Sequence, residues 1–192
     1  MSDPSELLAA VHAVVEAFER HGIRYFITGS LASSVQGEFR ATNDIDIVAD
    51  VDTSQLRPLL DELSRDFVAD HDQAFAALAS GSSFNLIHRV TYLKVDVFPC
   101  VSAFDAEATQ RAESIAISPG IASLRVATRE DILLAKIRWY RLGDETSETQ
   151  RRDIQRLIAL NAGEFDESYL HLWAMQLAIS DLLERFLSEE SM

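Results

Sequence analysis

The feature that most constrains the fold of this chain is residues 44–51, where aspartates alternate with apolar residues. The stretch reads Asp-Ile-Asp-Ile-Val-Ala-Asp-Val, and its β-branched residues favour a strand. Because alternate side chains of a strand point to opposite faces, Asp44 and Asp46 share one face while Ile45 and Ile47 share the other. Two like charges about 7 Å apart on a half-buried strand repel each other and are costly to desolvate. The fold must therefore either solvate this pair or neutralise it.

The acidic composition of the chain offers a plain interpretation of the pair. Asp and Glu total 31 against 17 Lys and Arg, a formal net charge of −14, so Asp-x-Asp patterns arise by chance. The pattern recurs at Asp50/Asp52 and at Asp70/Asp72, where it precedes predicted helices and suits an N-cap. Taken alone, any of these pairs is a solvated turn or strand edge. The first pair needs other evidence before a site is inferred.

Composition also excludes several classes of protein. The single cysteine, Cys100, allows no intramolecular disulfide and argues against a cysteine-based zinc site. No run approaches 18 apolar residues and the N-terminus does not resemble a signal peptide, so we expect a soluble, cytoplasmic protein without membrane contact. The net charge argues against broad nonspecific binding to nucleic acid. Residues 125–156 are the exception, with eight basic and six acidic residues, and form a candidate anion site.

Periodicity along the chain predicts an α+β fold, with a small mixed β-sheet flanked by helices and a helical C-terminal part. We expect a core domain with an N-terminal helix over residues 1–127 and a helical subdomain over residues 128–192. The patterns predict strands over residues 24–28, 44–51, 84–88, 91–98, 113–118 and 123–126. They predict helices from residue 4 to the His21-Gly22 stop and over residues 31–35, 54–65 and 73–79. In the C-terminal part they predict two helices that begin at caps at residues 128 and 147, and a third over residues 166–187.

Three features of this arrangement converge on one chemistry. Gly29 and Ser30 lie where a strand ends and a helix begins, so backbone N–H groups and a hydroxyl can hold phosphate oxygens there. Asp44 and Asp46 follow on the next strand, and Asp96 faces out of a later one. Three carboxylates beside a phosphate cradle suit divalent metal, because two Mg²⁺ ions about 3.5–4 Å apart neutralise the repulsion and clamp a phosphoryl displacement.

These residues also resemble a known family. The stretch "GSLASSVQGEFRATNDIDIVADV" is similar to the signature of the DNA polymerase β-like nucleotidyltransferase superfamily, a Gly-Ser followed at a distance by Asp-x-Asp. Its Arg40-x-Thr42-x-Asp44-Ile45-Asp46 form most resembles AbiEii-type abortive-infection toxins and their uncharacterised bacterial relatives. "LKVDVFP" resembles the third-carboxylate strand of the superfamily, and residues 129–158 resemble its downstream helices. The resemblance thus runs from residue 24 through most of the chain.

The resemblance implies a role for each carboxylate and for the Gly-Ser pair. Gly29 and Ser30 would grip a nucleoside triphosphate (NTP), and Asp44 and Asp46 would ligate both metals, Mg²⁺ or Mn²⁺. Asp96 would hold the catalytic metal and help to deprotonate the attacking hydroxyl. One departure concerns spacing, because residues 31–43 separate Gly29-Ser30 from the aspartates by more than in the most compact members.

Four further residues are nucleotide-binding candidates. Arg40 and Thr42 match the Arg-x-Thr of the family. Lys136 has mainly apolar neighbours at helical spacing, so its ammonium group either reaches to water or faces an anion, and the resemblance favours a phosphate contact. Asp153 would pair with Lys136 or with a neighbouring arginine, which without the resemblance reads as a surface ion pair. Lys94, the other lysine, shares the face of Asp96 and reads as a counter-charge.

The function implied is a metal-dependent nucleotidyltransferase, which moves a nucleoside monophosphate from an NTP to an acceptor hydroxyl and releases pyrophosphate. The sequence leaves the acceptor open among a protein side chain, an RNA or tRNA end and a small molecule. The alternative is a catalytically weak, nucleotide-binding regulatory protein. A further possibility, at the level of biology, is a toxin neutralised by an antitoxin partner.

Overall fold

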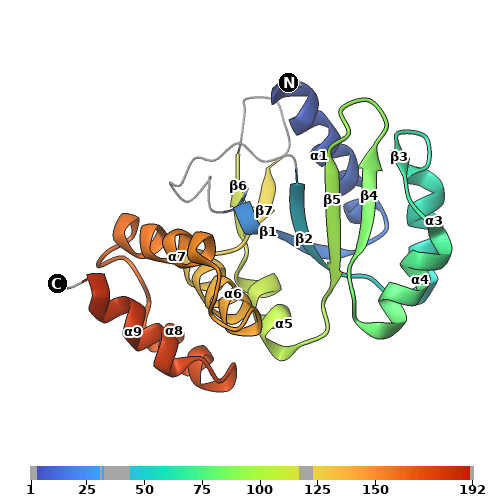
Figure 1. The fold of residues 1–192 in the computed structure, drawn as a ribbon. Helices are drawn as coiled ribbons and strands as arrows, with labels where there is room; N and C mark the ends of the chain where they lie inside the picture. The colour runs from blue at the N-terminus through green and yellow to red at the C-terminus, as the bar shows by residue number, and fades with distance from the viewer. Residues whose placement is uncertain (1–3, 31, 33–43, 117–122, 191–192) are drawn as a thin grey trace. The chain divides into compact units, whose positions relative to one another are not determined.

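A computed structural model describes residues 4–30, 32, 44–116 and 123–190 of the chain (Figure 1). Backbone contacts divide these residues into two compact units. The first ends at Ala127 and the second begins at Thr128, with Ala32 assigned to the second. The expected α+β class is confirmed, because a mixed sheet with flanking helices is followed by a helical C-terminal region. No helix among the described residues has the length and apolar character needed to cross a membrane.

The first unit contains all the strands of the described residues. Its helices are α1 (Pro4–Arg20), α3 (Thr53–Leu63), α4 (His71–Ser80) and α5 (Ala103–Arg111). Its strands are β1 (Arg24–Thr28), β2 (Asp44–Asp50), β3 (Phe67–Val68), β4 (Phe84–His88), β5 (Lys94–Pro99), β6 (Glu113–Ile115) and β7 (Leu124–Val126). The elements predicted over residues 24–28 and 84–88 are confirmed to the residue, and most of the others that lie on described residues to within one to four residues. The helix predicted over residues 31–35, apart from residue 32, and the last two residues of the strand predicted over residues 113–118 lie outside the described residues.

The strands form one mixed sheet in the order β3-β4-β5-β2-β1-β7-β6. β2 lies at its centre, antiparallel to β1 and parallel to β5. Strands β4 and β5 are antiparallel neighbours, as the short separation between them in the sequence predicted. Because β2 is hydrogen-bonded to a neighbouring strand on each side, its aspartate side chains project from a face of the sheet and do not lie on an edge strand.

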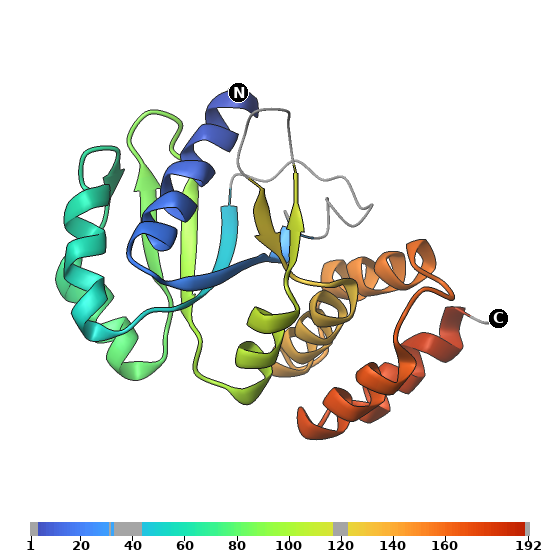
Figure 2. The same cartoon turned by 180° about the vertical axis from the view of Figure 1, so that it is seen from behind.

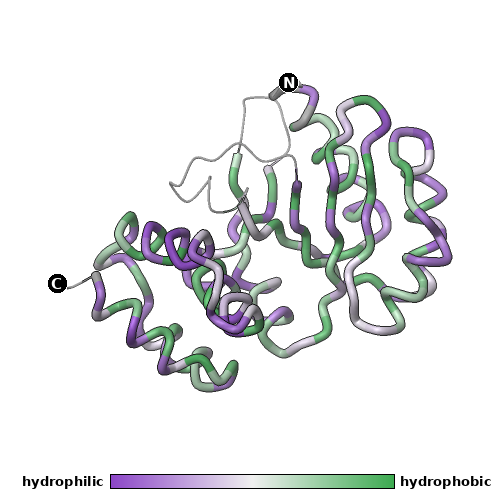
Figure 3. The backbone as a smooth tube through the Cα atoms, viewed as in Figure 1, coloured by the Kyte–Doolittle hydropathy of each residue, from purple (hydrophilic) through white to green (hydrophobic). Residues whose placement is uncertain are grey.

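One face of the sheet is crossed by α1, as Figure 2 shows. Ile45 and Ile47 of β2 are buried, at 4% and 0% exposure, and Val95 and Val97 of β5 are both at 0%. The apolar side of the alternation therefore forms the core, as predicted. In Figure 3 the central strands are mostly hydrophobic, whereas β2 begins with a hydrophilic stretch at its upper end. The sheet therefore has one apolar face and one face that carries the aspartates.

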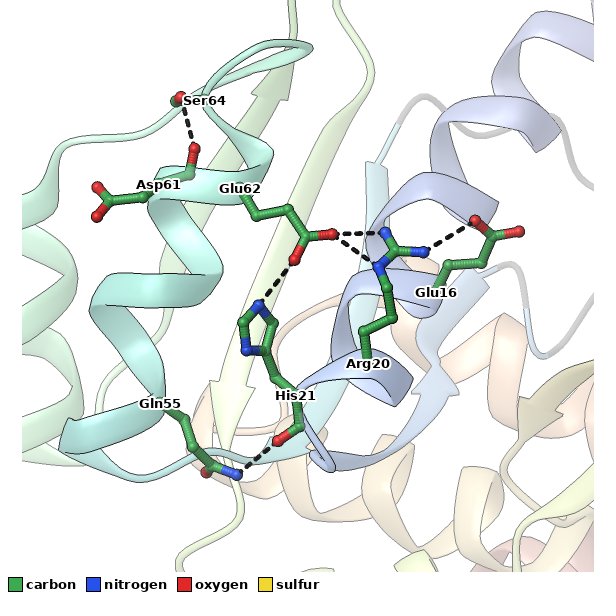
Figure 4. Close-up of polar contacts among 7 residues, drawn as sticks. All are labelled: Glu16, Arg20, His21, Gln55, Asp61, Glu62 and Ser64. Atoms are coloured by element: carbon green, nitrogen blue, oxygen red, sulfur yellow. Dashed lines mark hydrogen bonds and ion pairs between the residues drawn. The ribbon is translucent and has the colours of Figure 1, made fainter.

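Helices α1 and α3 pack side by side, and a polar cluster joins their ends (Figure 4). The guanidinium of Arg20 donates to the Glu62 carboxylate, with Nη2 2.6 Å from Oε1, and His21 Nε2 lies 2.8 Å from Oε2. Gln55 Nε2 donates to the His21 carbonyl at 3.0 Å. The Arg20 hydrogen bond lowers the pKa of the Glu62 carboxyl. Because these side chains are partly exposed, each ion pair stabilises the fold only weakly.

The second unit is helical and consists of α6 (Arg129–Leu142), α7 (Glu148–Leu160), α8 (Glu167–Gln176) and α9 (Ser180–Glu190). Helix α6 packs against the other three, and α7 and α8 each also contact α9. Tyr140 and Phe186 meet edge to face with ring centroids 5.7 Å apart. Both predicted caps are confirmed, because Thr128 and Ser147 accept from the backbone N–H groups of Asp131 and Gln150.

The structure corrects three expectations about the elements. The strand predicted over residues 91–98 begins only at Lys94, because Tyr92 adopts a left-handed φ of 58° and its N–H closes a turn onto the His88 carbonyl. The single helix predicted over residues 166–187 is two helices, with Ala178 at φ 56° between them. Helix α5 was not predicted, since it has only a weak apolar face, although Ser102 and Asp105 form a capping box at its start.

Candidate functional site

Strands β2 and β5 bring the three predicted carboxylates to one region of the sheet. In their parallel register Asp46 lies opposite Asp96, and Asp44 lies opposite Lys94. Neighbouring strands are about 4.8 Å apart, so the Asp46 and Asp96 side chains stand next to each other on the same face. The Asp44 residue is exposed and Asp46 is half-buried, and the Asp96 side chain is 14% exposed. The predicted alternation of β2, with aspartates on one face and isoleucines on the other, is thus confirmed.

An ammonium group lies among these carboxylates. Lys94 Nζ is 2.8 Å from Asp96 Oδ2, an ion pair between residues two positions apart on β5. The hydrogen bond to Asp96 is the largest cause of a raised Lys94 pKa. Burial opposes it and is the next largest cause, and the charges of Asp96, Asp44 and Asp46 raise the pKa further. A raised lysine pKa keeps the ammonium charged throughout neutral pH. The cluster therefore contains its own monovalent cation.

Gly29 lies directly against this cluster. It follows the end of β1, where Thr28 pairs with Asp46, and a helical segment begins there. Its φ is +67°, and a Cβ atom built on it would lie 1.9 Å from Asp46 Oδ2. No side chain can occupy this position unless the Asp46 carboxylate moves, so a glycine is required twice over, by backbone conformation and by space. The backbone of the predicted phosphate cradle thus touches one of the predicted metal ligands.

The oxygen chemistry of this cluster suits a hard divalent cation such as Mg²⁺, which binds through one or two carboxylates and substrate phosphates. As the side chains lie, no group of three or more His, Cys, Asp or Glu residues within the described parts of the chain is arranged to hold an ion. Asp46 and Asp96 are neighbours, and the Asp96 oxygen is engaged by Lys94. The carboxylate oxygens of the cluster are therefore of the type that Mg²⁺ prefers, and one of them, on Asp96, is paired with the Lys94 ammonium.

The remaining predicted residues fall into two groups. Lys136 of α6 and Asp153 of α7 form an ion pair within the second unit, with Nζ 3.6 Å from Oδ2 and both side chains 18% exposed. The pairing of Asp153 with Lys136, one of the alternatives from the sequence, is thus the one adopted, and it is largely shielded from solvent. Arg40 and Thr42 lie outside the described residues.

The second unit also contains a buried polar cluster, of which the sequence predicted only the Thr128 cap. The hydroxyls of Tyr169 and Thr128 donate to the two oxygens of the Asp131 carboxylate, at 2.6 and 2.7 Å. Glu130, also buried, accepts from the Asp166 N–H at 3.2 Å. The adjacent acids Glu130 and Asp131, in a helix with many apolar residues, were the sequence signal from which this cluster could have been predicted. Both Asp131 oxygens accept hydrogen bonds, so the cluster joins α6 to α8 and is structural.

The mixed sheet with flanking helices, followed by a helical C-terminal region, is a nucleotidyltransferase-like fold, as its likeness to solved structures shows. The solved structures of ANT(2'')-Ia are similar to it. The solution structure of this antibiotic-resistance factor has a TM-score of 0.59 and 14% identity, covering 96% of this chain and 99% of that one. Its crystal structure with adenylyl-2''-tobramycin has a TM-score of 0.56 and 15% identity, covering 91% and 97%.

An antibiotic adenylyltransferase also has a similar fold. The lincosamide antibiotic adenylyltransferase LnuA, in its lincomycin-bound crystal structure, has a TM-score of 0.51 and 18% identity, with coverage of 79% of this chain and 96% of that one. At these identities the likeness is one of fold. No protein-family model and no curated protein sequence matches the chain.

Proposed function

We propose that this protein is a metal-dependent nucleotidyltransferase, which transfers a nucleoside monophosphate from an NTP to an acceptor hydroxyl and releases pyrophosphate. The observation that carries the proposal is the proximity of three residues. Asp46 and Asp96 lie in register on adjacent strands, and Gly29 lies against the Asp46 carboxylate. Nothing in a purely structural sheet requires two acidic side chains side by side, because like charges directly opposite each other are destabilising. The nucleotidyltransferase-like fold supports the same proposal.

In this proposal Asp44, Asp46 and Asp96 hold Mg²⁺ or Mn²⁺, and Gly29 and Ser30 bind the triphosphate. The metal supplies charge neutralisation and lowers the pKa of the attacking hydroxyl. The chain itself contributes position, because the carboxylates are fixed by a central strand pair and the Gly29 backbone by the end of β1. Positioning and electrostatic stabilisation are the main means by which protein groups accelerate phosphoryl-type transfers.

We also propose that Lys136, Asp153, Arg40 and Thr42 contribute to nucleotide binding. For Lys136 the support is the basic character of residues 125–156 and an ammonium that is mostly shielded from water. Asp153 would then orient Lys136 rather than touch the nucleotide. For Arg40 and Thr42 the support is the Arg-x-Thr pattern ahead of Asp44. The same pattern carries the proposal of a relationship to AbiEii-type toxins, which would make an antitoxin a protein partner.

For the acceptor we propose a hydroxyl of a small molecule. ANT(2'')-Ia was solved with an adenylylated antibiotic and LnuA is an antibiotic adenylyltransferase, so two proteins with this fold act on small molecules. The net charge of −14 also opposes the approach of a long polyanion such as RNA. An RNA end or a protein side chain is then an outcome of the test rather than the expectation.

The test begins with binding. Mg²⁺ and ATP together should raise the melting temperature more than either alone, because each supplies ligands to the other. The double substitution Asp44→Asn and Asp46→Asn should abolish this joint shift. Asp50→Asn with Asp52→Asn is the matched control, since it makes the same charge change in another Asp-x-Asp pair of the chain, and asparagine can still cap α3 at position 52. An unchanged shift in the first variant would remove the metal assignment.

The second part of the test is transfer. The protein is incubated with α-labelled ATP, CTP, GTP or UTP, Mg²⁺ or Mn²⁺, and a cell lysate separated into small molecules, RNA and protein. We expect label in the small-molecule fraction with the wild type and none with the Asp44/Asp46 double variant. Label in RNA or protein would change the acceptor, and no label under any condition would favour a nucleotide-binding regulatory protein. Lys136→Ala in the same series should weaken ATP affinity measured by calorimetry.

A further inference from the structure

Lys94 is one of only two lysines in the chain, the other being Lys136. The first unit thus has a single ammonium side chain, and it lies on the carboxylate cluster. Its Nζ hydrogen-bonds to Asp96 Oδ2 at 2.8 Å, and in the strand register Lys94 stands opposite Asp44. Lys94 is thus a cation covalently attached to the site where a divalent ion would bind.

The position of Lys94 sets up a competition. Asp46 and Asp96 lie opposite each other on adjacent strands, an arrangement that is destabilising unless a cation lies near. The Lys94 ammonium supplies that cation through an oxygen of Asp96, a side chain that is 14% exposed. A divalent ion that ligates this oxygen must displace the ammonium, which would lose its hydrogen bond while remaining close to a second positive charge. Metal by itself therefore meets a site that is already partly neutralised.

We propose that Lys94 is a tethered cation that holds Asp96 when no nucleotide is bound and makes metal binding depend on the arrival of an anionic nucleotide. A triphosphate changes the balance, because its oxygens give the displaced ammonium a new partner and give the metal further ligands. Lys94 thus acts through Asp96 and is a positioning residue for the site. This inference rests on the proposed function, since it takes Asp96 to be a metal ligand.

A purely structural counter-charge would behave differently. If Lys94 only offsets repulsion within the sheet, its removal lowers the stability of the metal-free protein and leaves the link between metal and nucleotide binding unchanged. If it competes with metal, its removal strengthens the binding of metal alone and weakens the dependence of metal on nucleotide. The two roles are separated by metal affinity measured without nucleotide.

The experiment measures Mn²⁺ binding to the full chain by electron paramagnetic resonance, with and without ATP. Lys94→Met removes the charge and keeps the apolar part of the side chain, and Lys94→Arg keeps the charge. Arg24→Met is the matched control, because Arg24 Nη2 also pairs with an aspartate of β2, Asp50 Oδ2, at 2.7 Å. Asp50 is six residues along β2 from Asp44, about 20 Å away, so this variant makes the same change in net charge beyond the Debye length.

We expect Lys94→Met to bind Mn²⁺ alone about tenfold more tightly than the wild type, within the range of ordinary coupling between sites. ATP should then improve Mn²⁺ binding by a smaller factor in Lys94→Met than in the wild type. Lys94→Arg should bind Mn²⁺ alone as weakly as the wild type, and Arg24→Met should change the affinity little. Circular dichroism and thermal unfolding establish that each variant is folded before binding is measured.

Equal Mn²⁺ affinity in the wild type and a folded Lys94→Met, or weaker affinity in the variant, would overturn the inference. Should Lys94→Met not fold, Lys94→Gln replaces it and the same comparison applies. The proposed function fails separately, since it would show as no Mn²⁺ binding even with ATP in the wild type. The proposed function would stand, and the role of Lys94 would be rejected, under one pattern of results. Mn²⁺ binding with ATP would be lost in the Asp44→Asn and Asp46→Asn double variant, while Lys94→Met would match the wild type in Mn²⁺ affinity both with and without ATP.

Discussion

Asp46 is the residue on which the site converges, because each of its neighbours is constrained by it. Asp96 faces it across the strand pair, and Gly29 leaves no room for a side chain beside its carboxylate. Lys94 carries a charge whose stability is affected by it. A lysine with a raised pKa stabilises the folded state at all pH values below its unfolded pKa and loses that contribution as pH rises through the folded pKa. Near neutral pH the ammonium is therefore a constant part of the cluster.

Gly29 provides a prediction that separates backbone strain from close approach. Gly22 has the same φ of +67° but has nothing within 4 Å of a built Cβ, so it is a matched control. Gly22→Ala should cost about 1–2 kcal/mol of unfolding free energy through left-handed strain alone. Gly29→Ala should carry the same strain and also force the Asp46 carboxylate out of place. We therefore expect urea unfolding to detect a loss in both variants and calorimetry to detect lost Mg²⁺-ATP binding only in Gly29→Ala.

Retained ligand affinity in a folded Gly29→Ala would contradict this expectation. It would mean that the Asp46 carboxylate can rotate away without consequence, and that the contact with Gly29 is packing alone. Equal losses of affinity in both glycine variants would point to global destabilisation instead.

At the scale of elements, the sequence was most informative where capping and alternation act within a few residues. The strand of Asp44 and Asp46, the caps at Asp52 and Asp70, and the helix starting after Thr128 all depend on neighbours close in the chain, and all are confirmed. The gap between α8 and α9 was missed, because the apolar spacing continues across Ala178 without glycine or proline. A left-handed alanine is set by packing, which local pattern does not encode.

The candidate site divides in the same way. That Asp44 and Asp46 share one face of their strand could be predicted from strand alternation. The pairing of Asp46 with Asp96 could not, because it depends on the register of two strands far apart in the sequence. The contact of Gly29 with Asp46 depends on the chain turning sharply after β1. Lys94 was interpreted as a simple counter-charge, since its proximity to Asp44 appears only when β2 and β5 are paired. Register and close approach are tertiary properties, and they are what the sequence alone could not supply.

The cap of α6 provides the prediction at this scale. Thr128 accepts from the Asp131 N–H and its hydroxyl donates to the buried Asp131 carboxylate, whereas Ser147 at α7 makes only the cap bond to Gln150. Ser147→Ala should cost about 1 kcal/mol, an ordinary cap. Thr128→Ala should cost roughly 2–3 kcal/mol, because it also removes a hydrogen bond to a buried charge. Urea unfolding measures both values.

Thr128→Ser should recover most of the stability lost in Thr128→Ala, since it restores the hydroxyl. Equal costs for Thr128→Ala and Ser147→Ala would show that the buried carboxylate takes another donor without penalty.

At the scale of the whole molecule, charge frames the chemistry. A chain with a net charge of −14 binds an anionic triphosphate only where cations are concentrated. In the first unit the carboxylate cluster would recruit metal for this purpose, and the second unit contains most of residues 125–156, with their excess of basic side chains. An acidic protein with local cation sites favours small anionic ligands over long polyanions. Its acceptor is therefore expected to be small, and its nucleotide affinity to depend strongly on divalent metal.

Whether this molecule is an enzyme or a binding module is decided by Asp96. Asp44 and Asp46 are proposed to hold the metal that carries the triphosphate, so losing them should damage affinity and rate together. Asp96 is proposed to complete the coordination of the metal that would activate the attacking hydroxyl, and this contribution is expressed mostly in the transition state. Asp96→Asn should therefore keep ATP affinity within about tenfold, or ~1.4 kcal/mol, while abolishing label transfer. Calorimetry with Mg²⁺ and single-turnover transfer from α-labelled ATP measure the two effects, with exposed Asp72→Asn as the control for charge.

Transfer by Asp96→Asn at the wild-type rate would remove this carboxylate from catalysis. A wild type that binds ATP but transfers no label with any acceptor fraction would make the cluster a static ion site in a nucleotide-binding protein.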